Sequence, residues 1–146
     1  MSADVDALFG RDIALDERYR PVVTASGDVV LTSGIDTALQ EVRLRLFTPL
    51  GSLFYDVGYG SRIHWFVHEE STPATRTALE AEAARRIAED PAVQPLSVRC
   101  RVLKWDESRV ILEARFLLIG ISHPQHLVMN LDLSVLERVM EDVRTD

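Results

Sequence analysis

Residues 95–120 have the sequence PLSVRCRVLKWDESRVILEARFLLIG, and their alternating pattern decides the fold class of the chain. Apolar and polar side chains alternate on both sides of Asp106-Glu107-Ser108, which is typical of two half-buried strands joined by a turn. The apolar positions are Leu96, Val98, Cys100 and Val102 before the turn, and Val110, Leu112, Ala114, Phe116 and Leu118 after it. The pattern therefore predicts an antiparallel hairpin with one buried face.

The register of this hairpin follows from its turn. A turn at residues 106–108 places Val102 opposite Leu112 on the apolar face and Arg101 opposite Glu113 on the polar face. Opposite charges at facing positions are favourable. A shift of one residue would place Arg101 against Leu112, so the pattern excludes that register.

A third strand and a closing helix follow the hairpin. The segment HLVMNLDL, residues 126–133, has strand character, and residues 134–146 have the pattern of a helix. The third strand is the last of the sheet, so it lies at an edge unless another segment covers it. The backbone groups of an edge strand can pair with a strand from a partner. This makes four residues interface candidates: Leu127, Val128, Met129 and Asn130.

Two helices are predicted upstream of the sheet. Apolar side chains recur at helical spacing over about residues 34–47, which predicts the first. The second begins at a cap, Ser71 or Thr72, and ends before Asp90-Pro91, because the residue before a proline avoids helical angles. Further upstream, two short β-branched runs flank Ser26-Gly27-Asp28 and predict a small hairpin.

The order of these elements predicts an α+β fold, with an N-terminal hairpin and helices packed on a three- to four-stranded antiparallel sheet. We expect a single domain over residues 1–146, a length that can bury a core without disulfides. It comprises a loose lead-in at 1–12, a helix–loop–helix region at 33–92, a strand meander at 93–133 and a C-terminal helix at 134–146.

Composition excludes several classes of function. The net charge of -7 argues against a nucleic-acid partner, because phosphate binding needs clustered cations. No apolar run reaches the roughly 18 residues of a membrane span, and the first residues are acidic, so neither a membrane partner nor a signal peptide is expected. The single cysteine, Cys100, excludes an internal disulfide and lies on the apolar face of a strand, which favours a core position over a reactive thiolate.

Residues 48–62, TPLGSLFYDVGYGSR, form a glycine-rich connector after the first helix. A dinucleotide fingerprint would need a third glycine where Ile63 stands, so phosphate binding is not expected. Aromatic side chains on a loop shaped by glycine suit a protein partner better than a small substrate. The interface candidates of this connector are Thr48, Pro49, Gly51, Phe54, Tyr55, Tyr59, Gly60 and Ser61.

No catalytic, metal or cofactor site is predicted. His64 and His68 have metal-ligand spacing, but no third ligand is positioned, so we expect a surface pair with Trp65 and Phe66 packed inward. Asp56, Glu69 and Glu70 lie nearest the connector, and nothing marks any acid as one half of a catalytic pair. The basic residues Arg99, Arg101 and Arg115 share the polar face of the hairpin with Glu113, which indicates a solvated or partner-facing sheet surface.

The segment VLTSGIDTALQEVRLRLFTPLGSLFYDVGYGSRI, residues 30–63, resembles the signature region of the phage baseplate wedge family, protein W and its gene-25-like relatives. In that family a helix ends in a glycine turn, an aromatic-Gly-Ser segment follows, and a long helix leads to an acidic-Pro-Arg motif and strands. Here the motif is Asp90-Pro91-Ala92, so the arginine of the family is replaced. The resemblance covers roughly residues 28–133 and adds Asp90 and Pro91 to the interface candidates.

The resemblance implies a structural, non-enzymatic part of the baseplate of a contractile tail or injection machine. Such proteins join the wedge around the hub to the first sheath ring, so the implied partners are wedge, sheath, and hub or spike proteins, with several copies in a ring. Their sheath contacts are handshakes in which strands are exchanged. The implied location is a particle assembled in the host cytoplasm. Two alternatives stay open: a tail-associated lysozyme that hydrolyses peptidoglycan, and a cytosolic regulatory adaptor.

Overall fold

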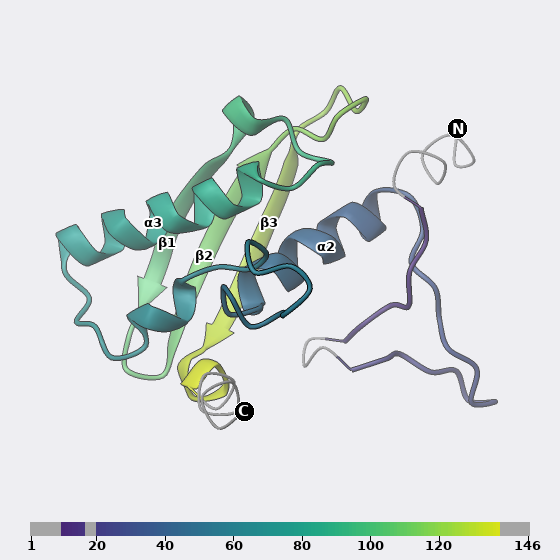
Figure 1. The fold of residues 1–146 in the computed structure, drawn as a ribbon, viewed down its shortest axis with the longest axis horizontal. Helices are drawn as coiled ribbons and strands as arrows, with labels where there is room; N and C mark the ends of the chain where they lie inside the picture. Colours follow the sequence, from purple (N-terminus) through teal and green to yellow (C-terminus); the bar gives the residue numbers. More distant parts are fainter. Residues whose placement is uncertain (1–9, 17–19, 138–146) are drawn as a thin grey trace. The chain divides into compact units, whose positions relative to one another are not determined.

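The computed structural model describes residues 10–16 and 20–137, and the chain forms two compact units, Met1–Val42 and Arg43–Asp146 (Figure 1). The division falls within the first labelled helix, α2 (Ile35–Phe47), which confirms the helix predicted over residues 34–47. Residues 1–9 of the predicted lead-in lie outside the described residues. The assignment of one domain over the whole chain stays a prediction.

The unit Met1–Val42 contains the segment predicted as a hairpin. Val23 and Val29 form an isolated antiparallel bridge across the turn, and no strand is assigned there among the described residues. The two side chains are 58% and 50% exposed. Without a buried face, a two-stranded ribbon is only marginally stable, so the segment forms bridges rather than a full hairpin. The side chain of Gln40 holds an adjoining bridged segment, accepting from Leu15 N and donating to Ile13 O, both at 2.8 Å.

The unit Arg43–Asp146 is built on a three-stranded antiparallel sheet in the order β1 (Arg99–Trp105), β2 (Arg109–Phe116), β3 (Gln125–Asp132). The predicted register is confirmed, with Val102 opposite Leu112 and Arg101 opposite Glu113. A bulge after Val102 then pairs Lys104 with Ile111. The pairing of β2 with β3 is regular along all eight residues of β3.

Helix α3 (Pro73–Ala88) covers one face of the sheet (Figure 1). Its N-cap is Thr72, whose hydroxyl accepts from Thr75 N in a capping box, and Pro73 occupies the first turn. The fully buried apolar side chains of the helix are Leu79, Ala83 and Ile87, and those of the sheet are Leu112, Ala114 and Phe116. Burial of each large member contributes roughly 1.5–3 kcal/mol. This core fixes the strands that form the candidate site.

The first predicted strand begins later than expected. Residues Pro95–Ser97 form the 3₁₀ helix η2, and Leu96 is 92% exposed instead of facing the core. Proline has no N–H to give to a ladder, so it stands in the first turn of η2. The chain before it is held instead by the bond from Gln94 N to Leu117 O, at 2.9 Å.

The closing helix is described in part. Residues 133–137 are helical, and the rest of the helix predicted over 134–146 lies outside the described residues. Within the described part, none of the helices has both the length and the apolar character needed to cross a membrane.

Candidate functional site

The connector at residues 48–62 is a loop closed at its base by backbone hydrogen bonds. Leu50 N donates to Ser61 O and Ser61 N donates to Thr48 O, each at 2.9 Å, which makes a parallel bridge between Pro49 and Ser61. The buried hydroxyl of Ser61 donates to Leu46 O at 2.6 Å. Compact loops with bonded ends are a usual form for functional surface loops.

Gly60 is the residue that the closed base requires. Its φ is +115°, and a Cβ at this position would lie 2.5 Å from Thr48 O and 3.0 Å from Leu50 N. Gly51 also has a positive φ, of +83°, but a Cβ there would meet nothing within 4 Å. Glycine is therefore needed at position 60 for close backbone approach as well as for conformation.

The aromatic residues of the loop divide into two groups. Phe54 and Tyr55 are 90% and 73% exposed, and their rings meet edge to face at 5.2 Å. Tyr59 is half-buried, and the centre of its ring lies 4.6 Å from the guanidinium carbon of Arg45. Phe54 and Tyr55 thus remain available to a partner, whereas Tyr59 belongs to the support of the loop.

Arg45 also forms a buried ion pair that joins two parts of the helix–loop–helix region. Its Nε lies 3.6 Å from Oδ2 of Asp90, and the side chains are 11% and 5% exposed. The other carboxylate oxygen of Asp90 accepts from Ala92 N at 2.9 Å. Asp90 therefore anchors the chain after α3, and Pro91 beside it is exposed. No sequence pattern singled out Arg45, because a basic residue in the last turn of a helix is ordinary.

The outer edge of β3 has free backbone groups. Met129 lies opposite Leu112, and Leu133 N bonds to Ser108 O, so the odd-numbered residues of this strand direct their backbone toward β2. The even-numbered residues His126, Val128 and Asn130 direct theirs outward. Within the described part of the chain, no backbone hydrogen bond occupies these outward groups. Their side chains are exposed, whereas Leu127 and Met129 are buried.

The opposite edge, at β1, is obstructed near its middle. Val102 N points away from β2 and donates to a carboxylate oxygen of Glu80 on α3 at 2.8 Å. The bulge directly after Val102 breaks the regular spacing of the strand. Charged partners and bulges are devices that keep a sheet edge from pairing with another chain. The two edges of this sheet are therefore unequal, and β3 offers the regular one.

The polar face of the sheet contains a charge network centred on Glu113. Its carboxylate lies 3.0 Å from Nε2 of His126 on β3, 3.5 Å from Nε of Arg115 and 3.7 Å from Arg101 on β1. The hydrogen bond from His126, and then the charges of the two arginines, lower the pKa of Glu113. The network joins all three strands, so much of the predicted basic patch is paired within the sheet.

His64 and His68, which have metal-ligand spacing, do not form the expected surface pair, because His64 is buried. His64 lies in the 3₁₀ helix η1 (Ile63–Phe66) and is 3% exposed, while Trp65 is 60% exposed, so the expected surface position of His64 and inward position of Trp65 were wrong. The reason is the tighter 3₁₀ turn, which changes the side chains that share a face. His68 lies beyond η1 and pairs with Glu137 at 3.5 Å.

Other candidate chemistries find little support in the geometry. Burial raises the pKa of the Cys100 thiol to about 12, so it is protonated at neutral pH. In residues 10–16 and 20–137, no three His, Cys, Asp or Glu side chains are grouped to hold a metal ion. Asp56 and Glu69 are exposed, whereas the general acid of a glycosidase lies in an apolar pocket.

The interface candidates therefore separate by accessibility. Those with exposed side chains or backbone are the loop tip with Gly51, Phe54 and Tyr55, then Pro91, and on β3 Val128 and Asn130. Those that are buried are Pro49, Gly60, Ser61, Asp90, Leu127 and Met129, whereas Thr48 and Tyr59 are half-buried. The buried candidates therefore support the loop and the strand on which the exposed candidates lie.

Comparison with solved structures finds the same fold in a tail protein and a baseplate protein. A proposed tail lysozyme from Geobacter sulfurreducens matches 70% of this chain and 94% of its own, with a TM-score of 0.59 and 22% identity. A chain of the six-fold symmetrised anti-feeding prophage baseplate matches 95% of this chain and 98% of its own, with a TM-score of 0.57 and 16% identity. No family model and no curated protein sequence matches. The predicted α+β fold, with helices on a three-stranded antiparallel sheet, is confirmed, and both of these proteins share it.

Proposed function

We propose that the chain is a structural component of the baseplate of a contractile tail or injection machine. In this role it joins wedge proteins around the hub to the first sheath ring, in several copies, within a particle assembled in the host cytoplasm. The support is the fold, which is similar to that of a chain in the anti-feeding prophage baseplate over 95% of this sequence. The exposed ring pair Phe54–Tyr55 is suited to a wedge contact, because aromatic side chains dominate many protein interfaces.

The observation that best supports a sheath contact is the free edge of β3. A strand from a neighbouring subunit would pair with the outward backbone groups of His126, Val128 and Asn130. Alternate side chains of that strand would extend the apolar face of Leu127 and Met129. In strand addition, backbone hydrogen bonds provide the affinity, and the contacts of alternate side chains provide the specificity.

The decisive variant is Val128→Pro. Its proline removes an outward N–H and leaves the ladder with β2 intact, because proline is tolerated at an edge whose N–H faces solvent. We expect purified particles to lose their sheath, while the isolated protein loses less than about 2 kcal/mol in urea unfolding. Electron microscopy of purified particles measures the loss of sheath. Equal loss of both would show that the docking edge lies elsewhere.

Two controls separate backbone from side chain. Val128→Thr keeps the N–H and the β-branched shape, so it should retain sheath attachment. Met129→Pro removes an N–H that faces β2, so it should prevent folding itself. Sheath loss with Val128→Thr would indicate that the side chain, not strand pairing, makes the contact.

The enzymatic alternative has a direct test. A zymogram of the purified protein should show no clearing of peptidoglycan. Clearing that disappears in Glu69→Gln or Asp56→Asn would overturn the structural proposal in favour of a lysozyme. A genome neighbourhood without sheath, tube, spike and wedge genes would instead favour a cytosolic adaptor.

A further inference from the structure

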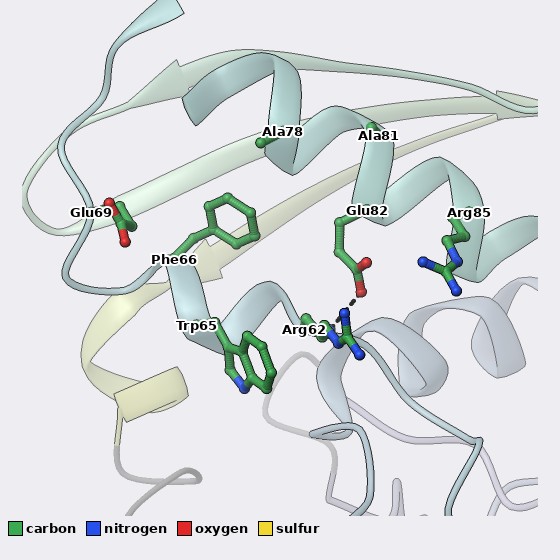
Figure 2. A pocket seen from close by; sticks show the side chains of 8 residues that line it. All are labelled: Arg62, Trp65, Phe66, Glu69, Ala78, Ala81, Glu82 and Arg85. Carbon is green, nitrogen blue, oxygen red and sulfur yellow. Dashed lines mark hydrogen bonds between the residues drawn. The ribbon is translucent and has the colours of Figure 1, made fainter. Parts of the chain in front are cut away.

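A third surface, separate from the loop tip and from β3, lies between η1 and the exposed side of α3. Figure 2 shows a shallow groove there, with Ala78 and Ala81 of α3 along one wall and Trp65 and Phe66 of η1 along the other. Trp65 is 60% exposed although it is a large apolar side chain. Tryptophan is among the residues most enriched at the energetic centres of protein interfaces, so an exposed Trp65 beside a groove is a candidate anchor.

The charges of the groove are ordered along its length. Glu69 lies at one end, and Arg62 and Arg85 lie toward the other (Figure 2). Glu82 also lies at the basic end. Its carboxylate accepts hydrogen bonds from Arg62 N at 2.7 Å and from Nε of the buried Arg86 at 2.8 Å. The basic end therefore retains two cations that face solvent.

The guanidinium of Arg62 is held but not neutralised. Its central carbon lies 5.0 Å from the centre of the Trp65 ring, and no acid in the described residues forms an ion pair with it. Arg85 has only a long contact of 3.9 Å with Glu89, between side chains that are 65% and 38% exposed. Such an exposed pair contributes little, so both cations remain available to a partner.

The walls of the groove select the secondary structure of its occupant. Both walls are helical and present side chains, so an extended peptide would find no ladder for its backbone groups there. A helix satisfies its own backbone, and the small side chains of Ala78 and Ala81, three residues apart, permit close approach of its axis. Helix-in-groove binding uses apolar anchors at i, i+3, i+4 and i+7.

We propose that this groove binds an amphipathic helix of a partner protein, with an acidic side chain of that helix at Arg62 and Arg85. The helix lies with its carboxyl-terminal end at these arginines and its amino-terminal end at Glu69. In that direction both ends of its dipole meet opposite charge on the groove. We expect the partner to be another protein of the same particle, and this part of the inference rests on the proposed function.

The test uses full-length protein with the photo-crosslinking residue p-benzoylphenylalanine at Ala81, expressed with the particle genes of its own strain. A matched control has the same residue at Glu107, in the exposed turn after β1. We expect Ala81 to crosslink, in purified particles, to one segment with helical apolar spacing and an acid near its carboxyl-terminal end. Mass spectrometry of the crosslinked peptide identifies that segment.

Charge variants test the order of the ends. Arg62→Glu combined with Arg85→Glu should lower the crosslink yield about tenfold or more. Arg76→Glu, on the same helix but outside the groove, should leave the yield within about twofold. Trp65→Ala, made in the protein without the crosslinking residue, should reduce incorporation of the protein into particles.

The outcomes separate this proposal from the proposed function. If the chain is present in particles but Ala81 gives no more crosslinking than Glu107, or crosslinks to an extended segment, the groove proposal is overturned alone. If the unmodified chain is absent from purified particles, both are overturned. A helical segment with its acid at the Glu69 end would refute the proposed direction.

Discussion

The backbone carbonyl oxygen of Thr48 lies 2.5 Å from the position that a Cβ atom would take on Gly60. This is nearer than such atoms approach one another in proteins, and the obstacle is backbone that the loop closure itself holds in place. Ser61 N, the next donor along the chain, bonds to the same oxygen at 2.9 Å. The closure of the loop and the glycine thus depend on each other.

Replacement of Gly60 should therefore cost more than replacement of Gly51, although both have a positive φ. Gly51→Ala introduces only the conformational strain, about 1 kcal/mol. Gly60→Ala adds the clash with Thr48 O, so we expect a loss of about 3 kcal/mol or more in urea unfolding, and Gly60→Val should also block assembly. Equal losses for the two alanine variants would show that close approach is not the requirement.

The ion pair between Arg45 and Asp90 should behave as a coupled unit. Arg45→Met leaves a carboxylate buried without its cation, which we expect to cost about 3 kcal/mol. Arg45→Met together with Asp90→Asn removes both charges and keeps an oxygen for Ala92 N, so much of that loss should be recovered. A double-mutant cycle by denaturant unfolding measures the coupling. Additive losses would indicate that the pair contributes no interaction energy.

His64 should make stability depend on pH. Burial lowers its pKa from 6.5 to about 4, opposed by the backbone of Phe47, and neither ring nitrogen makes a hydrogen bond of ordinary geometry among the described residues. The unfolded chain binds this proton more readily than the folded one, so stability is complete above pH 6.5 and falls as the pH is lowered toward 4. Between pH 7 and 5 the loss should be about 2 kcal/mol.

The variant His64→Leu should remove this dependence, because leucine cannot take a proton. Urea unfolding at a series of pH values from 7 to 5 measures the slope. His123→Gln, at an exposed position, should keep the slope of the unmodified protein. An unchanged slope in His64→Leu would assign the dependence to other groups.

Glu80 should protect the β1 edge from pairing with other chains. Glu80→Ala leaves Val102 N without its acceptor, which we expect to cost about 1–2 kcal/mol. It also opens the edge, so self-association measured by light scattering should rise. Glu107→Ala removes an exposed acid of the neighbouring turn and should change neither quantity. Unchanged scattering by the Glu80 variant would show that the bulge alone protects the edge.

Local patterns predicted the regular elements well. The alternation on either side of Asp106-Glu107-Ser108 predicted the pairing of Arg101 with Glu113, because side chains on a strand repeat every two residues and a turn fixes which residues face each other. Spacing and caps likewise predicted α2 and α3. Local rules were wrong at Leu96, which lies in η2, and at His64 and Trp65, which exchange their expected positions.

The sequence by itself determined the α+β order, the register of the first hairpin and the presence of a glycine-shaped loop, since these depend on residues close together in the chain. Only the tertiary structure decided that Arg45 pairs with Asp90, that Glu80 binds the β1 edge, and that Trp65 lines a groove. Each of these joins side chains from different elements. Their distances depend on how helices pack on the sheet, which no periodicity along the chain encodes.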